Sequence, residues 1–422
     1  MAIPDLSTSG MLRAFNERRV VELIAAEGPI SRAQIARVSG LSKPTVSLAL
    51  VRLEEHRLVR EVGRTSGGRG ATATLYALEP TAGYALAFDV GKRWLRAALV
   101  DVAGAEVARE TERTRLRPED ALVSQLCALT ERLVAAAAVD RAAVVAATLA
   151  TPGIVPGSGA DHVELAPSVP ALQRSGVLDR LREQLQVQLR VENDVNAAAM
   201  AELTYGVGRD EKDFAYVSLG TGVGLALVLD GVLRRGASAA AGEIGYLPAP
   251  TSAGGHGRAT TIETGASAAA LIRAAREEGS TARTAEGVVT GARSGDPAAG
   301  RALDRVAAVL TVGVAAACAV ADPAVVVLGG GIGLGAADLL IPRIERELHT
   351  LLPMRPRVVA SRLSGDAVLQ GAVATTLLAA RRIVFARTSR PDEAPRSSRP
   401  PLDNPRLGIP GTVQPVALLE DQ

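Results

Sequence analysis

Apolar residues in the first forty positions recur at helical spacing in two short segments. A stripe over residues 20–24 is followed by Gly28-Pro29, which predicts the end of a first helix. Ser31 then begins the stretch Ser-Arg-Ala-Gln, whose spacing is that of a capping box. It predicts a second helix that turns Ile35 and Val38 inward. This part of the chain therefore predicts two helices joined by a tight turn.

A third helix and a hairpin are predicted directly afterwards. Ser42 can cap a helix over residues 43–56. Its apolar positions are spaced for one buried face: Val46, Leu50 and Leu53. Two β-like runs follow, residues 58–62 and 72–78, joined by a glycine-rich turn. Three helices and a hairpin in this order predict a winged helix-turn-helix over residues 1–80.

From residue 83 onward, apolar strands alternate with helices. The predicted strands are residues 85–89, 95–101, 144–149 and 191–193 in the first half, and 216–219, 225–229 and 325–328 in the second. Helices are predicted at residues 194–205 and near 336–351. The alternation favours a layered α/β architecture, and its repeated strand–glycine–strand pattern suggests two similar lobes over residues 81–386. Seven prolines between Pro391 and Pro415 predict a disordered or loosely attached tail over residues 387–422.

The composition limits the class of protein without naming a partner. Of the 422 residues, 47% are hydrophobic and 22% are charged, which is typical of a folded globular chain. The 47 Lys and Arg nearly balance the 45 Asp and Glu, so the net charge of +2 points to no nucleic-acid or acidic partner. The chain has only two cysteines, Cys127 and Cys318, which excludes a disulfide framework and a four-cysteine zinc site.

The sequence predicts neither a secretion signal nor a membrane anchor. Asp5 and Arg13 interrupt the N-terminal region, so it lacks the pattern of a signal peptide. The uncharged, Ala-rich run over residues 306–321 is shorter than the ~18 residues of a membrane span. We therefore expect a cytoplasmic chain in which residues 306–321 form a buried helix.

The local charge of the N-terminal region differs from the balance of the whole chain. Residues 18–69 hold ten Lys or Arg and five Asp or Glu, a net charge of +5. With its apolar face turned inward, the third helix offers polar and basic side chains to DNA: Ser42, Lys43, Thr45, Ser47 and Arg52. Glycines of segment 63–70 surround Arg64 and Arg69, as in a wing that reaches a minor groove. The alternative is a merely solvated basic face on commonly capped helices.

Two glycine-rich segments follow predicted strands and suit the binding of phosphate. Gly220-Thr221-Gly222-Val223-Gly224 lies between two strands, and Gly329-Gly330-Gly331-Ile332-Gly333 follows residues 325–328. Glycines let backbone N–H groups approach a phosphate closely, and the Thr221 hydroxyl can also contact it. Tight turns use the same residues, so a purely structural role stays open.

The segment Glu192-Asn193-Asp194-Val195-Asn196 is more specific. It places carboxamide and carboxylate groups where a strand ends and a helix begins, which suits hydrogen bonds to several hydroxyl groups. An aspartate such as Asp194 at this point can deprotonate a sugar hydroxyl for phosphoryl transfer. The structural alternative is that Asp194 only caps the helix.

These segments together resemble the ROK family of sugar kinases and transcriptional repressors. Four segments occur in the same order along the chain as the motifs of that family: residues 192–202 (ENDVNAAAMAE), 220–224, 242–245 (GEIG) and 329–333. The resemblance covers about residues 81–385. It implies an actin-like fold of two lobes with a sugar between them. The preceding winged helix resembles the repressor branch, which includes xylose and N-acetylglucosamine repressors. The resemblance aligns Asn193, Asp194, Glu243 and Glu263 with sugar-contacting residues, with Asp194 at the position of the catalytic base.

The first departure from the family concerns ATP. The kinase phosphate motif Asp-x-Gly-Gly-Thr reads Asp89-Val90-Gly91-Lys92-Arg93 here. Because Lys92 and Arg93 replace two small residues, we expect no productive ATP binding. The same two cations can instead clamp a phosphate, which keeps a phosphosugar site or a residual nucleotide site open.

The second departure concerns zinc. Tyr246 stands where the family has a histidine, and the loop over residues 247–262 has no cysteine before Glu263. His256 is a single imidazole, whereas zinc takes four ligands, so we predict neither a metal nor another cofactor. Tyr246 can stack on a sugar face and change the choice of ligand; the alternative is that the pocket no longer binds sugar.

We therefore interpret the chain as a sequence-specific regulator of transcription, a repressor, that responds to a sugar or phosphosugar. Its partners would be a double-stranded DNA operator and further copies of itself, as a homodimer or homotetramer. Two winged helices would then read half-sites about 34–36 Å apart. The alternative from another class is an ATP-dependent sugar kinase with a DNA-binding extension. A third reading is a regulator without a ligand that uses its α/β body only for assembly.

Overall fold

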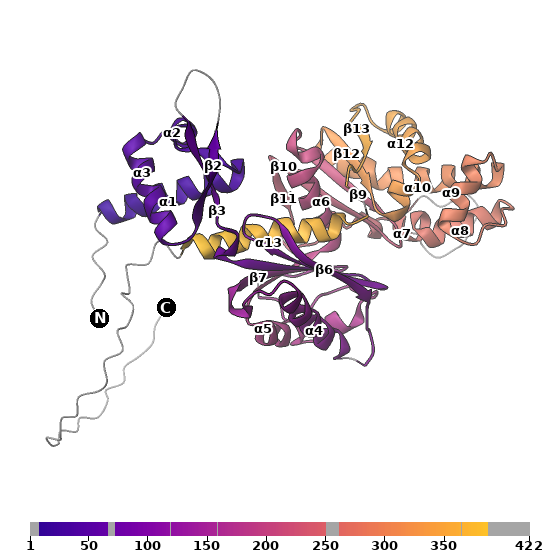
Figure 1. Ribbon diagram of the computed structural model, residues 1–422. Coiled ribbons are helices and arrows are strands. Elements are labelled where there is room, and N and C mark those ends of the chain that lie inside the picture. Colours follow the sequence, from indigo (N-terminus) through magenta and orange to yellow (C-terminus); the bar gives the residue numbers. More distant parts are fainter. Residues whose placement is uncertain are drawn as a thin grey trace, which may run out of the picture.

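The computed structural model describes residues 8–65, 72–118, 120–157, 159–249, 261–363 and 365–386. It shows an N-terminal module, two α/β lobes, and a long helix, α13, that runs from the lobes to the module (Figure 1). The predicted wing residue Arg69, the loop residue His256 and the predicted tail over 387–422 lie outside the described residues.

The N-terminal module is the predicted winged helix-turn-helix. Its elements are α1 (Thr8–Glu27), β1 (Ile30–Ser31), α2 (Arg32–Ser39), α3 (Lys43–Glu55), β2 (Val59–Thr65) and β3 (Ala73–Leu78). The three strands form one sheet in the order β1-β3-β2. Ser31 caps α2 in the predicted capping box with Gln34, and Ser42 caps α3. Local capping chemistry therefore sets where both helices begin.

The predicted buried face of α3 is confirmed, and one predicted position of α2 is wrong. Val46, Leu50 and Leu53 are buried in the core of the module. Val38, expected inside, is 53% exposed. The helix α2 has only eight residues, and its buried positions are Ile35 and Ser39. Those two residues form a narrow buried stripe, and Val38 lies at the edge of it, where the short helix leaves it exposed.

The first lobe surrounds a five-stranded sheet in the order β6-β5-β4-β7-β8. Its strands are β4 (Tyr84–Val90), β5 (Trp94–Asp101), β6 (Glu106–Arg113), β7 (Val144–Thr151) and β8 (Gln188–Asn193). Its helices are α4 (Ala121–Ala136) and α5 (Val177–Leu185), with short turns η1 (Pro80–Ala82), η2 (Arg141–Ala143) and η3 (Pro170–Gln173). The central strand β4 pairs antiparallel with β5 and parallel with β7.

The second lobe repeats this arrangement in the sheet order β11-β10-β9-β12-β13. Its strands are β9 (Phe214–Leu219), β10 (Val223–Leu229), β11 (Val232–Arg234), β12 (Val325–Gly329) and β13 (Arg357–Ala360). Its helices are α6 (Asp194–Tyr205), α7 (Ile262–Ala266), α8 (Ala268–Glu277), α9 (Ala285–Arg293), α10 (Pro297–Ala321), α11 (Gly331–Gly335) and α12 (Ala337–Leu351), with turns η4 (Val207–Arg209) and η5 (Ile244–Tyr246). If the strands are numbered from one within each lobe, both sheets have the order third, second, first, fourth, fifth. This repetition confirms the predicted pair of similar lobes.

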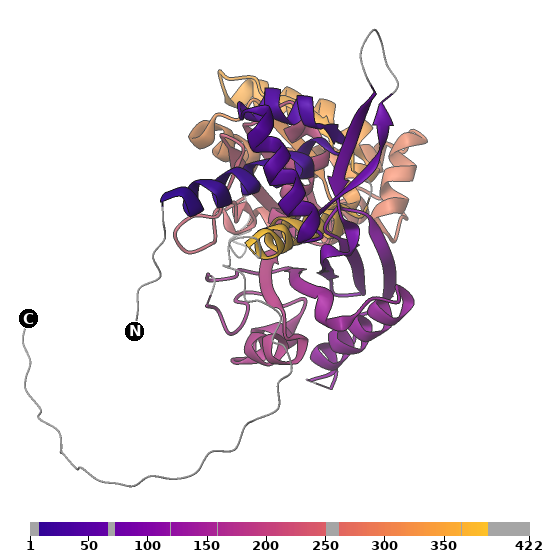
Figure 2. The same cartoon turned by 60° about the vertical axis from the view of Figure 1, so that its left-hand side comes forward.

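Helix α13 (Ala367–Phe385) belongs to neither lobe alone. It packs against α6 of the second lobe and against β4 and β7 of the first. Its last turns share a buried apolar cluster with the winged module, and both views place its end beside α1 (Figure 2). Both α10 and α13 are long and apolar enough to cross a membrane by length and composition. About half of each apolar window is buried inside the protein (50% and 56%), as in core helices.

Candidate functional site

The N-terminal end of α3 presents the side chains that were predicted to meet DNA. Ser42 and Lys43 are exposed, whereas Thr45 and Ser47 are half-buried. The Thr45 backbone N–H donates to the Ser42 hydroxyl oxygen (3.3 Å), and the two hydroxyls share a hydrogen bond of 2.8 Å. The Ser47 hydroxyl donates its only proton to the Lys43 carbonyl (2.9 Å). Lys43 and Ser42 are therefore the side chains most available to a phosphate.

Arg52 is placed differently from the other predicted DNA contacts. It forms an ion pair of 3.6 Å with Glu17 of α1, a carboxylate that is buried. Burial raises the pKa of Glu17, while the charge of Arg52 acts in the opposite direction. Arg52 therefore has a structural partner inside the module, and a role in DNA binding stays a prediction.

The strands of the wing carry the second predicted contact. Arg64 is exposed near the end of β2, opposite Thr74 of β3. The register shifts between Glu61 and Gly63, and Gly63 has a φ of 152°, so this bulge is built on a glycine. Arg64 thus extends from the distal end of the described hairpin.

The polar segment at residues 192–196 forms the start of α6, next to the first lobe. Asn193 is the N-cap: its side-chain oxygen accepts from the N–H groups of Val195 (2.9 Å) and Asn196 (3.1 Å). Its side-chain N–H donates to the Gly153 carbonyl (2.9 Å). Capping by Asp194 was the structural alternative, but the cap is Asn193, and Asp194 is the first helical residue. Asn193 therefore still has one side-chain N–H that can donate to a ligand. Most of the hydrogen-bonding capacity of the Asp194 carboxylate also remains available to a ligand.

Carboxylates gather around Asp194. Its pKa is raised to about 6, first by burial and then by the negative charges of Asp89 and Glu243. The pKa of Glu243 is itself raised, by burial and by the charge of Glu263. Partial burial and then the charges of Glu243 and Glu263 raise the pKa of Tyr246, a residue that is 59% exposed. The predicted set of Asp194, Glu243, Glu263 and Tyr246 therefore forms one electrostatically connected group, and its role as a sugar site stays a prediction.

Asp89 joins this group from the end of β4, and it has a cation of its own. Asp89 is buried, and Nη1 of Arg96 on β5 donates to its Oδ2 at 2.7 Å. Burial raises the pKa of Asp89, although the hydrogen bond and charge of Arg96 lower it. Lys92 and Arg93 are exposed in the turn between β4 and β5.

The two predicted phosphate loops lie at the carboxyl ends of β9 and β12, which are parallel neighbours. A Cβ on Gly220 would lie 3.7 Å from the Gly331 nitrogen, so the two turns approach each other. Close contacts explain several of the glycines. A Cβ on Gly330 would meet the Leu219 nitrogen at 2.7 Å, and one on Gly222 would meet the Glu263 carboxylate at 2.9 Å. Packing thus accounts for part of both motifs, and phosphate binding stays a prediction.

The remaining glycines of these motifs divide into two kinds. A Cβ on Gly224 would meet a methyl group of Val195 at 2.7 Å, and one on Gly329 would overlap the Tyr216 ring. Gly331 has open space around it, and Thr221 is exposed at the tip of its turn. Thr221 and Gly331 are therefore the members of the two loops with room for a ligand.

Sequence reasoning missed three charged residues that hold this region together. Arg235, after β11, donates to the buried Glu192 through Nε (3.0 Å) and Nη2 (2.5 Å). Arg96 and Asp366 belong to a second network near the start of α13. Spacing gave no signal for these residues, because tertiary contacts bring their partners to them. Glu192 is 43 positions from Arg235, and Asp89 meets Arg96 through the pairing of β4 with β5. Within the described residues, no group of three or more His, Cys, Asp or Glu is arranged to hold a metal ion.

The chain was compared with protein-family models and with curated proteins. The ROK family model matches residues 85–378 and the MarR family model matches residues 9–70. The xylose repressor of Bacillus subtilis is 23% identical over 252 residues, 58% of this chain and 62% of the repressor, so the match spans about three fifths of that relative. The transcriptional dual regulator NagC of Escherichia coli is 26% identical over 356 residues, 81% of this chain and 86% of the regulator.

Solved structures give the same picture of the fold. A ROK family transcriptional regulator, described as a homologue of the Escherichia coli MLC protein, superposes with a TM-score of 0.73 at 23% identity. It covers 90% of this chain and 99% of its own. A ROK hexokinase from Thermus thermophilus superposes with a TM-score of 0.60 at 27% identity, covering 71% and 99%. The winged module and the two-lobed body therefore both have counterparts of known structure.

Proposed function

The chain belongs to the ROK family, and from that premise we propose that it is a DNA-binding repressor of transcription whose two-lobed body binds a sugar or phosphosugar. The observation that carries the proposal is the winged module, joined through a shared apolar core to the body that holds Asp194 and the carboxylates around it. A DNA reader and a polar ligand site in one packed unit are what a ligand-controlled regulator requires.

The DNA half of the proposal assigns contact with the operator to the N-terminal end of α3 and to the distal end of the wing hairpin. Exposed Lys43 and Arg64 supply positive charge, and the N-terminus of α3 itself favours an anion. A single module of this size reads few base pairs, so we infer that two copies act together as a homodimer or homotetramer on half-sites of one operator. Such a regulator works in the cytoplasm, where it meets the chromosome.

The ligand half of the proposal assigns a sugar to Asn193, Asp194, Glu243 and Glu263. Carboxylates and a carboxamide are acceptors and donors for vicinal hydroxyl groups. Tyr246 provides an exposed aromatic face beside them. A phosphosugar would need cations, and Lys92 and Arg93 are the exposed cations in the turn just after Asp89.

Selection of duplexes from a random pool, followed by gel shifts at fixed salt, tests both halves. We expect one sequence class to be enriched, and its affinity to change about 5–150-fold with one of xylose, N-acetylglucosamine, glucose or their phosphates. Absence of any enriched sequence would refute the DNA half. Enrichment with an affinity that no sugar changes would refute the ligand half and leave the body as an assembly scaffold.

A kinase is the second candidate, and one observation favours it. A carboxylate whose pKa is raised to about 6 is suited to accept a proton near neutral pH. We infer that the chain is nevertheless not a kinase, because Arg96 already binds Asp89 and two long cations occupy the adjoining turn. An ADP-release assay across hexoses decides this: sugar-dependent turnover that Asp194→Asn abolishes would establish the kinase.

A further inference from the structure

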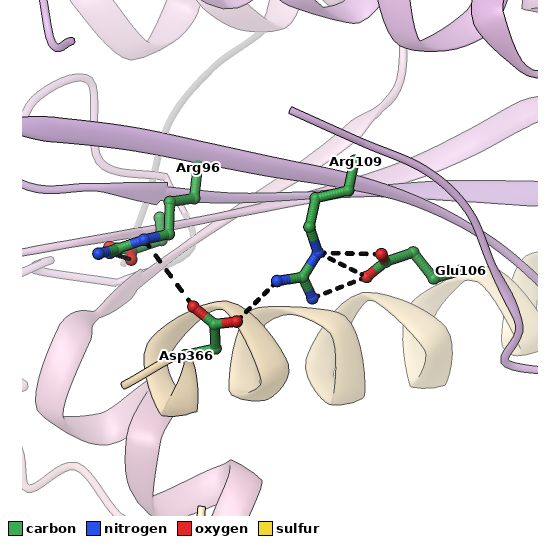
Figure 3. A network of polar contacts seen from close by, with 5 residues as sticks. Arg96, Glu106, Arg109 and Asp366 are labelled. Carbon is green, nitrogen blue, oxygen red and sulfur yellow. Dashed lines mark hydrogen bonds and ion pairs between the residues drawn. The ribbon is translucent and has the colours of Figure 1, made fainter. Parts of the chain in front are cut away.

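Helix α13 starts in a charged network that includes Asp89. Its N-cap residue, Asp366, lies between two arginines of the first lobe (Figure 3). Arg109 Nη1 donates to Asp366 Oδ2 at 2.7 Å, and Arg96 Nε lies 3.9 Å from Asp366 Oδ1. The other face of Arg96 binds Asp89 at 2.7 Å. One guanidinium therefore bridges the ligand-side carboxylate Asp89 and the first turn of α13.

The middle of α13 is packed directly on α6, the helix that Asp194 opens. A Cβ on Gly371 would overlap the carbonyl oxygen of Ala197, so the two backbones touch. Leu369 and Ala372 share a buried cluster with Ala197. A shift of α6 cannot be absorbed by soft side chains at this contact, because there are none between the two backbones.

The end of α13 is built into the winged module. Val384 and Phe385 lie in the same buried cluster as Ile24 of α1 and Tyr76 of β3. Arg381 Nε donates to the Val102 carbonyl at 2.9 Å, at the end of the first lobe nearest the module. With 19 residues, α13 spans about 28 Å from Asp366 to this shared core.

We propose that Arg96 is a positioning residue that ties α13 to Asp89, so that occupancy of the carboxylate site moves α13 and, through it, the winged module. This inference rests on the proposed function and names its internal link. Two carboxylates share one guanidinium: a ligand hydroxyl that engages Asp89 changes the hold of Arg96 on Asp366. The helix passes that change on as a rigid body, because its start, its middle and its end each pack closely against a different part of the chain.

The test compares Arg96→Met with Arg132→Met in the full chain. Arg132 is the matched control, because it is also an ion-paired arginine of the first lobe, bound to Glu110 at 2.8 Å and Glu112 at 3.3 Å on β6. Hydrogen exchange is measured without DNA or sugar. We expect Arg96→Met to raise exchange in the first turns of α13 and also in α1 and β3, and Arg132→Met to leave those elements unchanged. Increased exchange confined to the start of α13 would overturn the proposal.

A second readout uses the duplex selected by the wild-type chain from the random pool. Arg96→Met is expected to change affinity for this duplex at least about fivefold, and Arg132→Met less than twofold. Equal affinities for both variants would overturn the proposal. If no duplex is selected, the proposed function fails, whereas the exchange experiment still decides the link between Arg96 and the module.

Asp366→Asn guards against a variant that fails to fold, because Asp366 is a partly exposed carboxylate. It weakens the hold of both arginines on α13 while leaving the Arg96–Asp89 pair in place. It is expected to reproduce the exchange pattern of Arg96→Met. An unchanged pattern in a folded Asp366→Asn chain would count against the proposal.

Discussion

The helices α3 and α6 begin with the same local device and end up in opposite electrostatic surroundings. Each starts at a side-chain cap, Ser42 in one and Asn193 in the other, that satisfies the first free N–H groups. After the cap, α3 continues with Lys43 and has no acidic residue in its first turn, whereas α6 continues with Asp194. The cap therefore fixes where each helix begins, whereas the charges around the helix start determine which ligands can bind there.

The difference favours an anion at the start of α3 and a neutral, hydroxyl-rich ligand at the start of α6, in line with the proposed function. At α3, the helix dipole and Lys43 both attract a phosphate. At α6, the charges of Asp89 and Glu243 repel an anion and raise the pKa of Asp194. A phosphosugar could bind there only with its phosphate directed away from this group.

The largest expected effect concerns the buried counter-ion next to α6. Arg235→Ala removes the bidentate partner of Glu192, a buried carboxylate, and should destabilise the fold by about 3 kcal/mol. The neighbouring Arg234→Ala removes only an exposed pair with Asp230 and should cost less than about 0.5 kcal/mol. Urea unfolding of both variants measures the difference. If both variants lost the same free energy of unfolding, the buried pair of Arg235 would contribute no more to stability than the exposed pair of Arg234.

The next effect depends on pH. Because the folded pKa of Asp194 is about 6, above its usual 3.8, the folded state binds its proton more tightly, and the native chain loses stability as pH rises from about 4 to 6. Asp194→Asn should therefore stabilise the fold by about 3 kcal/mol at pH 7.5 and hardly at all below pH 4. Thermal unfolding across this range measures it. A gain that is independent of pH would show that the charge of Asp194 is not the cause.

Removing the two caps compares the helices directly. Asn193→Ala loses a cap of two N–H groups and the bond to the Gly153 carbonyl, and should cost about 2 kcal/mol. Ser42→Ala loses one capping bond and should cost about 1 kcal/mol. Chemical denaturation of both variants tests this order. A larger loss for Ser42→Ala would contradict the observed difference in hydrogen bonding.

The smallest effect on stability should accompany a clear effect on DNA. Lys43→Ala removes an exposed cation and should leave unfolding unchanged within about 0.5 kcal/mol. Loss of one phosphate contact should reduce the slope of log affinity against log salt by about 0.9. Lys212→Ala, whose ammonium donates to the Gly208 carbonyl in the second lobe, is the control and should keep the wild-type slope. Identical slopes for both variants would remove Lys43 from the interface.

Much of the fold followed from local patterns. Ser31 and Ser42 were predicted as caps, the buried face of α3 was predicted from its spacing, and the order of strands indicated two lobes. These features depend on residues three or four positions apart or on alternation along a strand, which a sequence displays directly. Val38 was predicted wrongly because a helix of eight residues buries too few positions for periodicity to fix its face.

The candidate site was predicted only in part. The motif around Asp194 was named from its residues, whereas Glu243 and Glu263 were named from the resemblance to the ROK family. In the structure the charge of Glu243 acts on Asp194, and the charge of Glu263 acts on Glu243. Nothing in the spelling indicated Arg96, because its partners Asp89 and Asp366 are brought to it by strand pairing and by the return of α13. Nor did it show that Asn193 rather than Asp194 is the cap.

The sequence by itself determined the helix starts, the alternation of strands and the polar segments that carry chemistry, because each depends on neighbouring residues. Only the tertiary structure decided which charges meet. Arg235 reaches Glu192 across 43 positions, and α13 returns to bind Arg96 and to enter the core of the winged module. Such contacts are selected by packing in three dimensions, and no local pattern encodes them.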